Sequence, residues 1–119
     1  METNTFIYLN LYFVDTIYKS LGCWKDTSDR AILTLEGSSS ILDGSYGSRT
    51  YAIQKCYEAA SSLGYDVFAI QDGGDCFSSA TARDTYKKHG PSTSCRDDGK
   101  GGPWANEVYE IVKGKFVYK

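Results

Sequence analysis

The chain has 119 residues, of which 41% are hydrophobic, enough for one domain with a single modest core. It carries 13 basic and 15 acidic residues, and this near balance argues against a nucleic-acid-binding protein, which would show a basic face. Ten tyrosines and two tryptophans accompany a single histidine, a composition that suits recognition by aromatic surfaces better than proton-transfer catalysis.

The first twenty residues predict extended structure. Alternating β-branched and aromatic residues indicate one long strand over residues 5–14 and a second extended segment over residues 16–24. The stretch has no basic n-region and contains Asn10 and Asp15, so we do not interpret it as a signal peptide, and it is too short and polar to span a membrane. We treat residues 1–20 as a strand segment and residues 21–119 as the module, within a single domain overall.

The middle of the chain predicts a loop followed by the main helix. Residues 29–37 form a third short apolar run, and residues 37–48 are too rich in serine and glycine for regular structure. Ser48 is the expected N-cap of a helix of about fifteen residues that ends at Gly64, the expected left-handed C′ residue. The apolar face of this helix comprises Ile53, Cys56, Ala60 and Leu63.

The remaining elements complete an α+β fold. Residues 65–71 predict a central strand buried on both faces. Residues 78–90 predict a second short helix, capped by Ser78 or Ser79 and stopped by Gly90. Residues 105–119 predict the last strand, with a hairpin about Lys113–Gly114 as an option. The expected architecture is a small antiparallel sheet with one main helix and a second short helix.

The four cysteines predict two disulfides and hence an extracellular, secreted protein. Free thiols are the alternative, and zinc is disfavoured because no two cysteines have the close spacing of a zinc knuckle. Cys56 lies on the inner face of the main helix and Cys76 follows the buried strand beneath it, so these two should meet. Cys23 would then join Cys95.

Catalysis is not expected. The single histidine, His89, lies at the predicted end of a lysine-rich helix, where a cation complements the helix dipole. Possible glycosidase carboxylates lie mostly in turn sequences, where aspartate is common because it bonds the local backbone. These carboxylates are Asp72, Asp75, Asp97, Asp98 and Glu107.

No cofactor is predicted, although one calcium site is conceivable. Asp97, Asp98, Asn106 and Glu107 surround a glycine-rich bend, and calcium prefers several hard oxygen ligands. The pattern is not that of an EF-hand, and a solvated turn is the alternative interpretation.

Two tryptophans lie in glycine-flanked bends. Glycine allows close backbone approach and can leave an aromatic face open, as at a sugar-binding platform. Burial of both Trp24 and Trp104 beside the cystines is the slightly favoured alternative. Tyr46, in the serine- and glycine-rich loop, is the more exposed aromatic candidate.

Three stretches resemble a cysteine-stapled module of secreted and cell-surface proteins of marine invertebrates, which is itself similar to WSC domains. These stretches are GCWKDTSDRAI, KCYEAASSLGYDVFAIQDGGDCFSS and GPSTSCRDDGKGGPWANEVYEI. The residues that match the WSC pattern are Gly22, Cys23, Trp24, Asp26, Arg30, Cys56, Gly64, Tyr65, Phe68, Ile70, Gln71, Gly73 and Cys76. The chain has fewer cysteines than WSC domains usually carry, and PAN/apple modules are the next nearest in layout.

The resemblance implies a non-enzymatic extracellular recognition module that binds a glycan or another matrix component. The expected site combines the aromatic rings of Tyr46 and Trp104 with hydrogen bonds from Asp72, Asp98 and Asn106, since stacking plus a few polar groups is what a sugar site requires. The rival interpretation is a structural subunit. In that case the long N-terminal strand would pair with another copy at a sheet edge.

Overall fold

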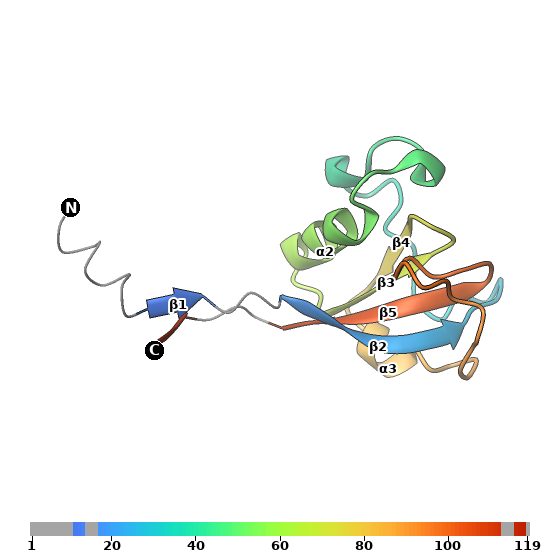
Figure 1. Cartoon of the computed structure of the whole chain (residues 1–119). Helices are drawn as coiled ribbons and strands as arrows, with labels where there is room; N and C mark the ends of the chain where they lie inside the picture. The colour runs from blue at the N-terminus through green and yellow to red at the C-terminus, as the bar shows by residue number, and fades with distance from the viewer. Residues whose placement is uncertain (1–10, 14–16, 113–115, 119) are drawn as a thin grey trace.

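The computed structural model describes residues 11–13, 17–112 and 116–118 (Figure 1). In chain order, its elements are β1 (Leu11–Phe13), β2 (Tyr18–Lys25), η1 (Ser40–Leu42), η2 (Tyr46–Ser48), α2 (Ala52–Ser62), β3 (Val67–Gln71), β4 (Asp75–Ser78), α3 (Ala82–Thr85), β5 (Ala105–Ile111) and β6 (Phe116–Tyr118). The predicted α+β class is confirmed, with a four-stranded antiparallel sheet, one main helix and one short helix.

The four strands follow the order β2-β5-β3-β4, so β3 is an inner strand, and all five of its residues are buried. Because side chains alternate along a strand, Phe68 and Ile70 pack with α2, whereas Val67 and Ala69 pack with α3. Figure 1 shows the two helices on opposite faces of the sheet. Burial on both faces explains the continuous apolar run, and the predicted central strand is confirmed.

The main helix begins later than predicted. Ser48 lies in η2, and the residue before α2 is Tyr51, which has a φ of 52° and forms no side-chain cap. Arg49 is extended and its side chain is held by other loops, which keeps this segment out of the helix. The predicted C′ residue Gly64 is confirmed by its φ of 79°, whereas Leu63 is 48% exposed because it lies at the C-cap, beyond the packed face.

The third apolar run is not a strand, and the second helix is shorter than predicted. Residues 29–37 contain only an isolated bridge between Thr34 and Phe77, although Leu35 and Leu33 each exchange a backbone hydrogen bond with β4. The segment thereby covers the outer edge of that strand. Helix α3 has Thr81 as its N-cap residue, so neither predicted serine holds that position. Ser78 instead ends β4.

The end of the chain pairs with its beginning. Strand β6 pairs with β1 in a separate two-stranded sheet, with Leu11 opposite Tyr118, so the suggested hairpin between β5 and β6 is wrong. Figure 1 shows this small sheet lying away from the four-stranded one. Most of the predicted strand over residues 5–14, and the Lys113–Gly114 turn, fall outside the described residues.

Both disulfides form as predicted. Cys23 is bonded to Cys95 with 6.0 Å between Cα atoms, and Cys56 to Cys76 with 5.5 Å. The first joins β2 to the loop before β5, and the second joins α2 to β4. Two disulfides fit an exported protein. In the part of the chain that the structure describes, no helix has the length and apolar character needed to cross a membrane.

Candidate binding site

Trp104 occupies an unusual backbone position. Gly102 and Ala105 each donate an N–H to the other's carbonyl, at 3.0 and 3.1 Å, and so close a two-residue turn. Pro103 is the first residue of this turn, and Trp104 the second, with a φ of 53°. That place normally takes glycine or asparagine, because a larger side chain in left-handed conformation costs about 1 kcal/mol. The turn therefore carries strain, and Trp104 at its second position is 54% exposed.

The guanidinium of Arg30 lies over the Trp104 ring. Its central carbon is 5.0 Å from the centroid of the indole and 5.2 Å from that of Phe77. Both distances fall within the range of cation–π attraction. Arg30 thus connects the exposed tryptophan to the core ring of β4.

Asp26 holds both of these residues, Arg30 through its buried carboxylate and Trp104 through its backbone N–H. Its Oδ2 accepts hydrogen bonds from Arg30 Nη1 at 2.8 Å and from Gln71 Nε2 at 2.9 Å, and its Oδ1 accepts the Ala31 N–H at 2.9 Å. Its backbone N–H donates to the Trp104 carbonyl at 3.0 Å. Burial alone would raise the pKa of Asp26, but these hydrogen bonds bring it below its usual value.

A cavity of about 370 Å³ opens beside Arg30. Tyr46 borders it on the serine- and glycine-rich loop, and Phe77 and Asp75 border it on β4. The full lining comprises Arg30, Thr34, Glu36, Gly44, Ser45, Tyr46, Asp75 and Phe77. Trp104 does not line the cavity and is linked to it through Arg30, whose guanidinium lies over the indole.

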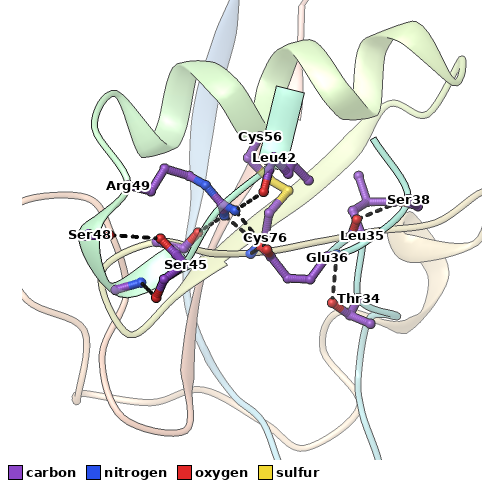
Figure 2. A network of polar contacts seen from close by, with 12 residues as sticks. Thr34, Leu35, Glu36, Ser38, Leu42, Ser45, Ser48, Arg49, Cys56 and Cys76 are labelled. Carbon is purple, nitrogen blue, oxygen red and sulfur yellow. Dashed lines mark hydrogen bonds and ion pairs between the residues drawn. A yellow bond between two sulfur atoms is a disulfide. The ribbon is translucent and has the colours of Figure 1, made fainter. Parts of the chain in front are cut away.

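A buried arginine holds the Tyr46 wall in place. Arg49 makes a two-pronged ion pair with Glu36, at 2.7 and 2.8 Å, and also donates to the carbonyls of Leu42 and Gly74. Figure 2 shows this guanidinium beside the Cys56–Cys76 disulfide, in the middle of the polar network. A side chain at Gly74 would collide with the Tyr46 carbonyl, 2.2 Å from its Cβ position. The loop therefore sits against the β3–β4 turn in a fixed position.

Asp75 is the carboxylate of the cavity that no described residue pairs with. No hydrogen bond or ion pair reaches its carboxylate from residues 11–13, 17–112 or 116–118. Burial, with a further contribution from the negative charge of Glu36, raises the pKa of Asp75 to about 6. Such a carboxylate has acceptor capacity to offer a ligand.

The structure divides the predicted site. Tyr46 lines the cavity, and Trp104 is exposed beside it rather than buried against the cystines. Asp72 lies in the β3–β4 turn, 3.8 Å from Arg96, and close enough to affect the pKa of Asp75. Asp98 lines a second cavity of about 300 Å³, with Tyr18, Tyr51 and Lys100, which shares no lining residue with the first.

Asn106 is an interior residue, and Trp24 is partly buried. Asn106 is fully buried and accepts a hydrogen bond from Gln71 Nε2 at 2.9 Å, so its side chain lies in the interior and not on the surface of the predicted site. Its place in the inward-facing row of β5 explains this burial. Trp24 packs edge-on against Tyr86 at 5.4 Å, and its indole N–H donates to the Leu21 carbonyl. The sequence favours burial of Trp24 in the core, and the residue packs against the core cluster but stays partly exposed.

The conceivable calcium ligands do not gather. Among the described residues, no three or more acidic, histidine or cysteine side chains are placed to hold a metal ion, and Asp97, Asp98 and Glu107 form no such group. Asp98 accepts the Lys100 N–H within its own turn, and Glu107 accepts the Ser20 hydroxyl. His89 contacts the Asp29 carbonyl at 2.7 Å.

Sequence reasoning did not assign Arg30 to a site, and it considered Asp75 only as a possible glycosidase carboxylate. Arg30 belongs to the motif that resembles WSC domains, which was a usable signal, whereas Asp75 follows a glycine pair and looked like an ordinary turn residue. No protein-family model matches this chain, and no curated protein matches it. The function is therefore inferred from the site itself.

Proposed function

We propose that this protein is an extracellular, non-enzymatic recognition module that binds carbohydrate on the surface formed by Trp104, Arg30 and Tyr46. The observation that carries the proposal is the exposed indole of Trp104 in a left-handed turn position. Nothing in the fold requires tryptophan there, because glycine would fit the same turn with less strain. Strained residues cluster at ligand-binding and active sites, where the surrounding structure holds them in place.

The surroundings of Trp104 suit a sugar. The C–H face of a pyranose stacks on an aromatic ring, and its hydroxyl groups need nearby donors and acceptors. Arg30 supplies donors and Asp75 supplies acceptors, and both line the adjacent cavity with Tyr46. The cavity volume, about 370 Å³, is at the lower end of the range typical of small-molecule sites.

The same cavity is poorly equipped for glycoside hydrolysis. A glycosidase requires two carboxyl groups, one acid and one base or nucleophile. Glu36 is held by Arg49 and by the Cys76 N–H, which leaves Asp75 alone. This supports binding over catalysis.

The test compares two glycine substitutions. Trp104→Gly should abolish binding on a glycan array and in calorimetry with the array's best ligand, while the fold is retained. Tyr51→Gly is the matched control, because Tyr51 is an aromatic residue that is 80% exposed with a φ of 52° but lies outside the cavity. Binding that survives Trp104→Gly, or is lost with Tyr51→Gly alone, contradicts the proposal.

A second candidate function is self-assembly through the β1–β6 sheet. A two-stranded sheet alone is marginally stable, and further pairing would complete it. The outer edge of β2 is less available, since Lys25 and Cys23 already bond to the 90–92 segment and a bulge follows Ser20. Light scattering over a range of concentrations tests this, and a deletion of residues 1–14 should abolish any assembly that it detects.

A further inference from the structure

The charges around the cavity balance except at one residue. Glu36 is neutralised by the two-pronged ion pair with Arg49, whose side chain is almost completely buried. Arg30 is paired with Asp26 at 2.8 Å. Asp75 has no such partner among the described residues, so one negative charge remains in excess at this wall of the cavity.

The position of Asp75 on its strand brings three kinds of contact together. Asp75 and Phe77 are two residues apart on β4 and therefore point to the same face, where both line the cavity. Arg30 covers the Phe77 ring, and only its Nη1 is hydrogen-bonded within the described part of the chain. Its other N–H groups remain available. A carboxylate acceptor, a guanidinium donor and an aromatic wall thus lie side by side.

Building on the proposed carbohydrate function, we propose that Asp75 is the ligand's hydrogen-bond acceptor and that its unbalanced charge selects neutral glycans over acidic ones. One hydroxyl of a vicinal diol donates to the Asp75 carboxylate, and the neighbouring hydroxyl accepts from Arg30. Hydrogen bonds to a charged group are roughly twice as strong as neutral ones. A uronate or sulfate would instead bring a second negative charge to Asp75, and Arg30 is already paired with Asp26.

The ionisation of Asp75 gives this inference a pH signature. The charged groups that act on it are Glu36 and Asp72, which raise its pKa, and Arg30 and Arg49, which lower it; burial is the largest influence, and the pKa of Asp75 is about 6. The neutral diol binds the ionised form. Affinity should therefore reach its full value above pH 7 and fall as the pH drops through 6. Below that pH the protonated carboxyl of Asp75 must lose its proton before the diol can bind.

The experiment measures the affinity of hexasaccharides of β-linked glucose and of mannose, with hexagalacturonate as the acidic probe, by calorimetry at pH 7.5 and pH 5. The native protein should bind a neutral probe better than the uronate and lose about tenfold in affinity at the lower pH. Asp75→Asn should bind the neutral probe about tenfold more weakly, with a flat pH profile and reduced discrimination. Asp84→Asn, which removes an exposed carboxylate of α3 that does not line the cavity, should behave as the native protein.

The outcomes separate this inference from the function on which it rests. If Trp104→Gly abolishes binding but Asp75→Asn keeps native affinity and pH dependence, carbohydrate binding stands and the role of Asp75 is wrong. A native protein that prefers hexagalacturonate also overturns the selectivity. If the native protein binds neither these probes nor any glycan on the array, both proposals fall.

Discussion

Asp26, which follows β2, and Asp75, which begins β4, have opposite surroundings. Asp26 is buried and accepts hydrogen bonds from a guanidinium, an amide side chain and a backbone N–H. Asp75 is half-buried and accepts none from the described residues. The pKa of Asp26 is accordingly lowered, and that of Asp75 is raised to about 6.

The comparison shows that the carboxylate of Asp26 stabilises the fold, whereas that of Asp75 has no hydrogen-bond partner among the described residues. Burying a charge costs free energy unless hydrogen bonds replace those it made to water. Asp26 recovers that cost within the chain and fixes Arg30 and Trp104. Asp75 accepts no such hydrogen bond from the described residues, and its partial burial makes its charge unfavourable to the fold. Each aspartate lies close in sequence to a disulfide, Cys23–Cys95 and Cys56–Cys76 respectively.

The largest effect is expected from the disulfides, which hold both regions. Their sequence separations are 72 and 20 residues. Loop-closure entropy assigns them about 4 and about 3 kcal/mol, a large share of the stability of a small domain. Reduction should therefore unfold the protein or lower its Tm steeply, as measured by circular dichroism. An unchanged Tm after complete reduction would show that neither region depends on its disulfide.

Asp26→Asn should destabilise the fold by about 3 kcal/mol, because an amide N–H₂ would face the donors of Arg30 and Gln71. Asp29→Asn is the control, since its exposed ion pair with Lys88 contributes little. In the native protein the contribution of Asp26 is present above about pH 4 and is lost as the pH falls through the lowered folded-state pKa. Equal urea midpoints for the two variants would contradict the structural role of Asp26.

Trp104→Gly should change the free energy of unfolding by no more than about 1 kcal/mol, since relief of strain offsets the lost stacking on Arg30. A core tryptophan would instead cost about 3–5 kcal/mol. Chemical denaturation of this variant beside Tyr51→Gly decides between the two. A loss of about 3–5 kcal/mol in the free energy of unfolding would show that Trp104 packs in the core, and it would weaken the contrast between the surroundings of Asp26 and Asp75.

Asp75→Asn should stabilise the protein, by about 1 kcal/mol at pH 7.5 once solvent screening is allowed for. The sign follows from the raised pKa of Asp75, because the folded protein binds this proton more tightly than the unfolded chain does. The gain should shrink as the pH falls below 6 and vanish near pH 4, as Tm measurements across this range would show. Destabilisation at neutral pH would mean that Asp75 serves the fold, as Asp26 does.

The sequence predicts well what local pattern determines. The apolar run at 67–71 could only be a strand covered on both sides, and the position of Cys56 on the helix face then set both disulfide pairings. Gly64 likewise marked the end of the helix.

The site was only partly predictable, because its properties arise from contacts between distant segments. The exposure of Trp104 depends on a turn closed across Gly102 and Ala105, and the pKa of Asp75 depends on Glu36 and on burial by another loop. The late start of α2 depends on Arg49 reaching across to Glu36. Asn106 points into the core because of its position in β5, and the turn residues that precede it in the sequence did not indicate this burial.

The central claim is that a glycan stacks on Trp104, and the two tryptophans provide an internal comparison. In a spectrum of the ¹⁵N-labelled protein each indole N–H gives its own signal, and Trp24 donates its N–H to the Leu21 carbonyl within the fold. Titration with a neutral hexasaccharide that binds should shift the Trp104 indole signal progressively and leave that of Trp24 in place. A ligand that binds while the Trp104 signal stays unchanged would contradict the account.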